Sequence, residues 1–162
     1  MEAKDRGEWL EQAMARWEQE MIRLCFACLG NRALAEEAVQ ETFLKAWKGY
    51  DRFRGAAQEK TWLTRIAVNT CRDIRRGAWF RHRRVTLSLE EVPEGAEPFT
   101  PEEDEVTRAV LRLPPKLRDV VALHCLQGFS AEETAALLGV TRSTVFARLK
   151  KARAALRKEL EG

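Results

Sequence analysis

FSAEETAALLGVTRSTVFARLKKAR, residues 129–153, decides the fold of this chain, because it predicts two short helices joined at a glycine. Ser130 is followed three residues later by Glu133, which is the pattern of a capping box at the start of a helix. Gly139 follows the last apolar residues of that helix and can adopt the left-handed conformation that ends it. Thr141 can then cap a second helix. The stretch therefore predicts a helix-turn-helix.

The second helix of this motif is predicted to be amphipathic. Its buried stripe consists of apolar residues at spacings of three and four, namely Val145, Leu149, Ala152 and Leu156. Its remaining surface combines small residues near the N-terminus with basic residues further along. Small residues allow close approach, and basic residues suit phosphates and guanine edges, as in a recognition helix in the DNA major groove. A packed helical hairpin with a solvated basic face is the alternative, and DNA binding is favoured.

The charge of the chain is high and nearly balanced, with 28 Lys and Arg against 25 Asp and Glu in 162 residues. The length suits one domain or two small ones. Residues 72–84 and 142–157 are rich in basic side chains, whereas residues 90–105 contain acidic residues and no Lys or Arg. The distribution predicts two basic surfaces separated by one acidic strip.

The sequence also limits the compartment and the class of protein. No apolar run is long enough to cross a bilayer, and the N-terminus lacks the charged-then-apolar pattern of a secretory signal. We therefore expect a cytoplasmic protein without direct membrane insertion. The chain shows no pair of catalytic carboxylates, no nucleophile with a base and no phosphate-binding glycine loop, so an enzyme is not expected.

Four cysteines are too few and too scattered for a secreted disulfide framework, so free thiols are expected. Cys25 and Cys28 have the CxxC spacing of a zinc or redox site, which could also draw on Cys71. Both lie on the same helical stripe as Met21 and Leu24, and no second CxxC follows. Small core residues are therefore the favoured interpretation, and no metal or cofactor is expected.

The first half of the chain is predicted to form three helices, at about residues 7–29, 34–48 and 60–76. The second of these helices has an outer face on which a leucine is surrounded by acidic and amide side chains. This face consists of Glu37, Gln40, Glu41 and Leu44. It suits a protein partner, and an ordinary solvated helix face is the open alternative.

Aromatic and basic residues interleave between and along these helices. The loop expected at residues 50–59 carries Tyr50, Phe53 and Arg54, which could stack on an unpaired base, although taken alone it favours anchoring to the core. The outer face of the third helix carries Arg65, Asn69, Arg72 and Arg76, and further aromatic and arginine residues follow it: Trp79, Phe80, Arg81, Arg83 and Arg84. This density of arginine favours a nucleic-acid surface over a merely solvated face.

A second helical unit is expected after a linker. Residues 85–100 contain two prolines, a glycine and a string of glutamates, which is typical of a flexible acidic linker. A helix at about residues 116–127 is expected to bury Val120, Leu123 and Leu126 or its neighbours. The predicted fold is all-α, with small helical domains at residues 1–84 and 101–162.

Taken together, these segments resemble the bacterial RNA polymerase sigma factors of the extracytoplasmic-function (ECF) group of the sigma-70 family. AEEAVQETFLKAW, residues 35–47, resembles the core-binding helix of the family. FRGAAQEKTWLTRIAVNTCRDIRR, residues 53–76, resembles its promoter-melting and minus-ten segment. LPPKLRDVVALHCLQGFSAEETAALLGVTRSTVFARLKKARAAL, residues 113–156, resembles its minus-thirty-five domain. The resemblance implies sigma region 2 in the first domain and sigma region 4 in the second.

The resemblance also implies roles for residues. The core polymerase would contact Glu37, Gln40, Glu41 and Leu44. Minus-ten recognition and melting would fall to Tyr50, Phe53, Arg54, Trp62, Arg65, Asn69, Arg72 and Arg76. Minus-thirty-five recognition would fall to Arg142, Ser143, Thr144, Phe146, Ala147, Arg148, Lys150, Lys151 and Arg153. The implied partners are the RNA polymerase core enzyme, promoter DNA and an anti-sigma factor, and no covalent step is catalysed.

One departure from the family pattern affects DNA recognition. Family members often carry a basic residue and then serine where this chain has Phe146 and Ala147, so its promoter preference should differ. A stand-alone helix-turn-helix regulator is the alternative function. That alternative leaves the arginine-rich third helix and the face around Leu44 without a purpose.

Overall fold

The computed structural model describes residues 3–53, 58–84 and 105–161, with the backbone alone for residues 3–4 and 78–84. The described residues form helices and no strand, as the all-α prediction requires. The first half contains α1 (Ala3–Leu29), α2 (Arg32–Lys48), α3 (Tyr50–Phe53) and α4 (Glu59–Arg84). The second half contains α5 (Glu105–Leu111), α6 (Pro115–Val120), the π-helix η2 (Val121–Leu126), α7 (Ala131–Leu138) and α8 (Arg142–Glu161).

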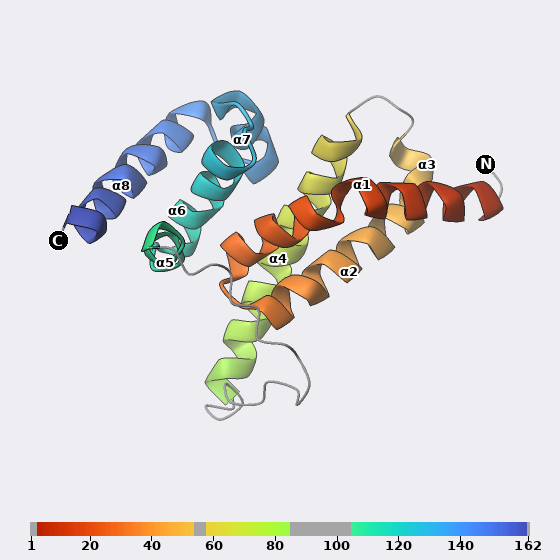
Figure 1. The fold of residues 1–162 in the computed structure, drawn as a ribbon, viewed down its shortest axis with the longest axis horizontal. Coiled ribbons are helices and arrows are strands. Elements are labelled where there is room, and N and C mark those ends of the chain that lie inside the picture. Colours follow the sequence, from red (N-terminus) through yellow and green to blue (C-terminus); the bar gives the residue numbers. More distant parts are fainter. Residues whose placement is uncertain (1–2, 54–57, 85–104, 162) are drawn as a thin grey trace.

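The first half is a bundle in which α1, α2 and α4 pack on one another (Figure 1). Met21, Leu24 and Leu63 are fully buried at its centre. On α2, the face opposite Leu44 is buried, with Val39 and Phe43 in the core, and Asn31 caps the helix by accepting a hydrogen bond from the Leu34 amide at 3.0 Å. Burial of these stripes provides the main stabilisation of the bundle, because apolar surface removed from water lowers the free energy.

The segment at residues 50–53 and the end of α4 differ from the prediction. Residues 50–53 were expected in a loop but form the short helix α3, in which the Arg52 amide donates to the Gly49 carbonyl at 2.9 Å. The helix expected to end at Arg76 continues to Arg84, because Gly77 costs a helix too little free energy to end it. The residues after Arg76 therefore extend α4 rather than following it.

The helix-turn-helix forms as predicted. The Ser130 side chain accepts from the Glu133 amide, and the Glu133 carboxylate accepts from the Ser130 amide, which completes the capping box. Gly139 ends α7 with φ 69° and ψ 33°, in the left-handed region. The Thr141 hydroxyl accepts from the Thr144 amide at 3.1 Å and caps α8.

The helix before this motif contains a register shift that the sequence did not indicate. In η2 the Gln127 amide donates to the Ala122 carbonyl, five residues back, at 3.0 Å. The wider turn rotates the residues that follow, and Leu126 is 58% exposed. Leu123 is buried as predicted, whereas the burial expected for Leu126 is wrong.

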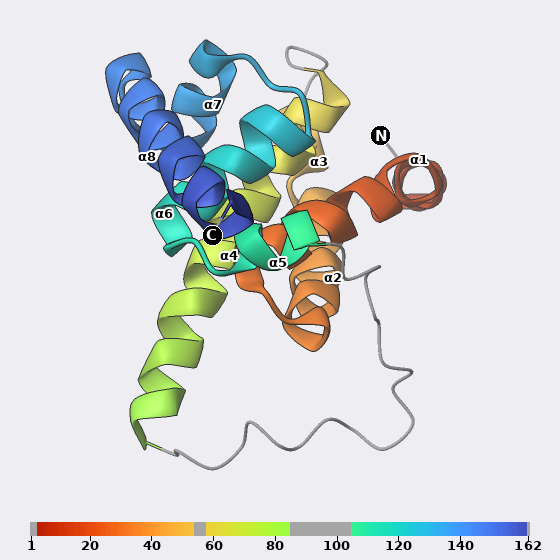
Figure 2. The same ribbon diagram turned by 60° about the vertical axis from the view of Figure 1, so that its left-hand side comes forward.

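The two halves pack against each other, with α6 and η2 on α1 and α7 on α4 (Figures 1 and 2). They share one apolar core that includes Met21 from the first half and Leu123 from the second. Between them, the guanidinium of Arg75 makes two hydrogen bonds of 2.8 Å to the carboxylate of Asp119, which is buried. The predicted linker at residues 85–100 lies outside the described residues.

Candidate functional site

The outer face of α2 is exposed as predicted. Glu37, Gln40 and Glu41 are exposed there, and Leu44, one turn after Gln40 and Glu41, is 45% exposed. A pocket of about 310 Å³ opens beside this face, between α2 and α4. Its lining residues are Leu34, Glu37, Glu41, Lys45, Thr70, Asp73, Ile74 and Gly77. Three carboxylates, Glu37, Glu41 and Asp73, line the pocket beside Leu34 and Ile74, which suits a protein segment that carries basic and apolar side chains.

Four aromatic side chains meet where α1, α3 and α4 come together. The ring centroids of Trp9 and Tyr50 are 4.7 Å apart. Phe53 stacks on Trp62 with centroids 4.9 Å apart and an interplanar angle of 27°. Tyr50 and Phe53 are therefore anchored to the bundle, which is the interpretation that the loop alone favoured, and both remain only half-buried. Trp9, 41 residues before Tyr50 in the chain, was missed because no local pattern relates residues so far apart.

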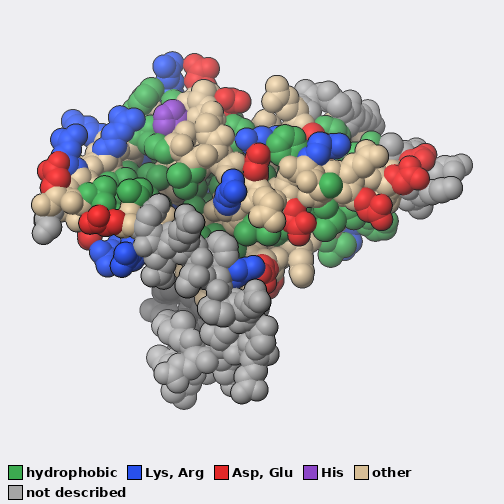
Figure 3. Space-filling view, viewed as in Figure 1, with side chains coloured by type: hydrophobic (Ala, Val, Ile, Leu, Met, Phe, Trp, Pro, Cys, Tyr) green, Lys and Arg blue, Asp and Glu red, His purple; other side chains and the backbone are tan. Residues whose placement is uncertain are grey.

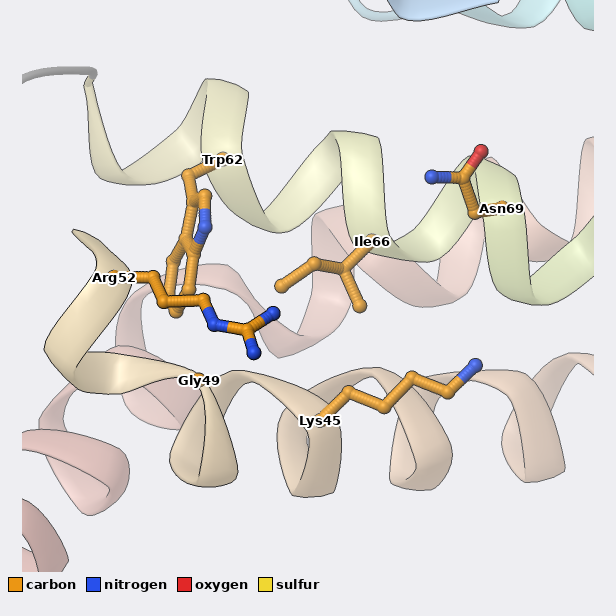
Figure 4. A pocket seen from close by; sticks show the side chains of 6 residues that line it. All are labelled: Lys45, Gly49, Arg52, Trp62, Ile66 and Asn69. Atoms are coloured by element: carbon orange, nitrogen blue, oxygen red, sulfur yellow. The ribbon is translucent and has the colours of Figure 1, made fainter.

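A second pocket, of about 240 Å³, lies next to these rings (Figure 4). Trp62 and Asn69 from α4 line it, together with Arg52 from α3. The other lining residues are Lys45, Gly49 and Ile66. In Figure 4, Trp62 and Ile66 point from α4 toward α2 and α3, and the Arg52 side chain runs beside the indole. An indole face, an amide and two cations can stack on a base, bond its edge and neutralise its phosphate.

The predicted minus-ten residues do not all share this pocket. Trp62 and Asn69 line it, and Arg65 and Arg76 are exposed elsewhere on α4. Arg54 lies outside the described residues, as do the side chains beyond Gly77. Arg52 and Lys45 were not predicted as site residues. The sequence feature that could have identified Arg52 as a site residue is its place between Tyr50 and Phe53.

The start of α4 is held in place by Glu59. Its carboxylate accepts hydrogen bonds from Trp9 Nε1 at 2.6 Å and Trp17 Nε1 at 2.9 Å, and from Arg16 Nη2 at 2.8 Å. Burial alone would raise the pKa of Glu59, but the hydrogen bonds from Trp17, Arg16 and Trp9 outweigh it and hold that pKa below its ordinary value. This contact ties α1 to α4 beside the aromatic rings.

Arg72 was predicted on the nucleic-acid face of α4, and it contacts the second half of the chain instead. Its Nη2 donates to the Leu138 carbonyl at the end of α7, at 2.6 Å. That carbonyl is one of the acceptors left without an intrahelical partner at a helix C-terminus. In this arrangement the Arg72 guanidinium is engaged at the contact between the two halves.

The outer surface of α8 is exposed and basic. Figure 3 shows Lys and Arg side chains gathered over this helix. Exposed residues of the predicted set are Arg142, Ser143, Phe146, Ala147, Lys150, Lys151 and Arg153, while Thr144 and Arg148 are half-buried. The stripe of Val145, Leu149 and Ala152 is buried, which turns the predicted reading surface outward.

Comparisons with known proteins match both halves of the chain. The family described as Sigma-70 region 2 matches residues 13–81, and the family described as Sigma-70, region 4 matches residues 103–156. The ECF RNA polymerase sigma factor SigM of Mycobacterium tuberculosis is 34% identical over 148 residues, which cover 90% of this chain and 74% of SigM. The chain belongs to the ECF RNA polymerase sigma factors.

Other relatives of this ECF sigma factor agree with the assignment. SigW of Bacillus subtilis, also an ECF RNA polymerase sigma factor, is 29% identical, with 89% of this chain and 84% of SigW covered. Among solved structures, CnrH in complex with the cytosolic domain of CnrY has a TM-score of 0.70 at 25% identity, covering 98% of this chain and 92% of CnrH. RpoE from Bartonella quintana, in complex with the anti-sigma factor NepR, shares the fold with a TM-score of 0.74 at 24% identity. The match covers 93% of this chain and 96% of the RpoE chain.

These matches identify the two halves of the sigma factor. The α1–α4 half carries region 2, and the α5–α8 half carries region 4. The domain limits 1–84 and 101–162 stay predictions. No helix in the described residues of this sigma factor has both the length and the apolar character needed to span a membrane.

Three of the four cysteines of this sigma factor lie in the region 2 core. Cys25, Cys28 and Cys71 are buried, and hydrogen bonds link the Cys71 thiol to the other two. A hydrogen bond with Cys71, together with burial, raises the pKa of Cys28 well above its ordinary value. Thiols buried inside a core act as small apolar residues, as the sequence indicated.

Proposed function

We propose that this sigma factor directs promoter recognition and melting through three surfaces with separate tasks. The outer face of α2 binds the polymerase core enzyme. The pocket between α3 and α4 holds a base of the opened minus-ten strand, and α8 reads the upstream duplex. The observation that carries the proposal is the pocket, because it brings Arg52, Trp62 and Asn69 from two helices to one place suited to an unpaired base.

Transcription in vitro tests the function as a whole. With core polymerase and a promoter library, the chain should select promoters and start transcription, and the isolated chain should bind the same duplexes weakly. Tight sequence-specific binding of duplex DNA without polymerase, and no transcription with it, would favour the stand-alone regulator instead.

The polymerase contact is supported by Leu44, an exposed apolar side chain one turn after the exposed Gln40 and Glu41 on the same helix. Interfaces of this type place an apolar residue at the centre of a polar ring. The double variant Glu41→Ala/Leu44→Ala should lose polymerase association and keep its fold. A matched control, Glu11→Ala/Leu160→Ala, removes an exposed glutamate of α1 and an exposed leucine of α8. Wild-type affinity in the first variant would rule out this interface.

The strand contact is tested by comparing closed and opened promoters. Base flipping costs a few kcal/mol, which stacking and cationic contacts in the α3–α4 pocket offset. Arg52→Ala/Asn69→Ala should therefore slow open-complex formation on duplex promoters, and an artificial bubble at the minus-ten element should restore much of the rate. Arg23→Ala, an exposed arginine on α1, serves as the control. A defect of equal size on duplex and bubble templates would contradict a role in melting.

Regulation by an anti-sigma factor in the cytoplasm is the remaining part of the proposal. Two of the similar solved structures contain a sigma factor bound to a second protein, NepR in one and the cytosolic domain of CnrY in the other. A partner purified with this chain and then produced separately should inhibit transcription in vitro at a one-to-one ratio. A partner that binds without inhibiting would contradict this regulation.

A further inference from the structure

Phe146 is exposed at the beginning of α8, in the surface proposed to read DNA. Its side chain is 49% exposed. Among the described residues, the other large exposed apolar side chains are aliphatic: Leu44, Val106, Leu126 and Leu160. A single exposed apolar residue is common and needs no explanation by itself. The position and the neighbours of Phe146 are what point to a ligand.

The orientation of Phe146 is set by the helix. Val145, the residue before it, is fully buried, and Leu149 is buried one turn later. The Thr141 cap fixes the first turn of α8. Phe146 therefore projects from a rigid helix rather than from a loop, and Ala147 beside it is small enough to let the helix approach a groove floor closely.

One face of the Phe146 ring is already occupied. The guanidinium of Arg142 lies over it, 5.3 Å from the ring centroid, and Arg142 Nη1 is 3.2 Å from Glu132 Oε1 on α7. The glutamate offsets the positive charge at this end of α8, whereas Lys150, Lys151 and Arg153 stand further along the helix. Phosphate binding is thus better served by the distal residues, and the end at Phe146 is better suited to base edges.

The chemistry of a phenyl ring limits which groups on the base edges it can recognise. It has no hydrogen-bond donor or acceptor for the polar groups of guanine, adenine or cytosine. The major groove offers one apolar group, the 5-methyl of thymine, and phenylalanine is among the side chains that contact it. We propose that Phe146 reads the 5-methyl group of a thymine in the upstream promoter element. The inference rests on the proposed role of α8 as the reading helix and adds the group that it recognises.

Replacing thymine by deoxyuridine removes only the methyl group and tests the proposal. The full chain with core polymerase first selects a promoter from a library, and each thymine of the upstream element is then replaced in turn. We expect one position at which uracil weakens binding by about fourfold, the value of one methyl-sized group removed from an apolar contact. In Phe146→Ser, thymine and uracil should bind equally at that position, and Phe146→Leu should keep the preference.

The controls separate this inference from the proposed function. Leu160→Ser removes another exposed apolar residue of α8 and should keep the preference for the methyl group. If the wild-type protein with polymerase selects a promoter but tolerates uracil at every thymine, the inference is wrong and the proposed function stands. A preference that persists in Phe146→Ser, or a selected upstream element without thymine, also overturns it. If no promoter is selected at all, the proposed function and the inference fall together.

Discussion

At the scale of single residues, Glu59 shows how one side chain can position a site that it does not line. It accepts hydrogen bonds from two tryptophans and an arginine of α1, while it stands in the first turn of α4. A carboxylate in that turn also interacts favourably with the helix dipole. Glu59 thereby holds the N-terminal end of α4, and Trp62 one turn later, against α1.

Glu59→Gln should destabilise the protein in a pH-dependent way. The pKa of Glu59 lies below its ordinary value in the folded state, so the ionised group stabilises the fold above pH about 4.3. This stabilisation is lost as the pH falls through the folded-state pKa. At pH 7 we expect the variant to lose about 1–3 kcal/mol of unfolding free energy in urea, and the difference from wild type should shrink in acid. Glu11→Gln, at an exposed position on α1, is the control. A loss that does not change with pH would contradict the ionised contact.

The sequence predicted which side chains are exposed better than it predicted their tertiary contacts. Exposure of Glu37, Glu41 and Leu44 follows from the position of each on one helix, and the structure confirms it. Glu59 and Trp9 were not predicted to meet, because they lie 50 residues apart and no spacing rule connects them. Contacts of that kind depend on how helices cross.

At the scale of helices, local sequence signals were sufficient to predict the helix ends that carry capping residues. Ser130, Gly139 and Thr141 each act on backbone groups within a few residues, and all three behave as predicted. The π-helix η2 and the short helix α3 carry no cap of that kind that the sequence revealed. Both depend on packing with other helices, so local patterns could not predict them.

Two glycines test this distinction between the end and the middle of a helix. Gly139→Ala should cost about 1–2 kcal/mol of unfolding free energy, because φ is 69° there and a Cβ is disfavoured in the left-handed region. Gly77→Ala should instead add about 0.5–1 kcal/mol, because Gly77 lies within α4 and a Cβ there meets nothing within 4 Å. Urea unfolding of both variants measures the two effects. The same sign of change for both would contradict the conformations described.

At the scale of the whole molecule, regions 2 and 4 are held together by buried polar contacts as well as by a shared core. Arg75 of region 2 pairs with the buried Asp119 of region 4, and the Lys60 ammonium of region 2 lies 5.4 Å from the Phe129 ring centroid of region 4. In this arrangement α8 keeps its outer surface exposed, whereas Arg72 of α4 is engaged by the Leu138 carbonyl. Use of Arg72 on DNA would require the two regions to separate.

Asp119→Asn should weaken the contact between the regions. Removing one charge of a buried pair leaves the other uncompensated, which costs on the order of 3 kcal/mol. We expect lower stability in urea and a larger radius of gyration by small-angle X-ray scattering. Glu159→Gln breaks the Arg112–Glu159 pair, whose side chains are 65% and 42% exposed, and should cost at most about 1 kcal/mol without expansion. An Asp119→Asn protein as compact and stable as wild type would contradict this role of the ion pair.

The sequence by itself determined the longer helices, the caps of the helix-turn-helix, the exposed face around Leu44 and the resemblance to ECF sigma factors. These depend on apolar periodicity and on hydrogen bonds between residues close in the chain. Only the tertiary structure decided that Arg52 joins Trp62 and Asn69 in one pocket, that Glu59 fastens α4 to α1, and that Arg72 contacts region 4. Those contacts follow from how helices distant in sequence pack, since a side chain's partners across an interface are set by helix crossing and burial rather than by its neighbours along the chain.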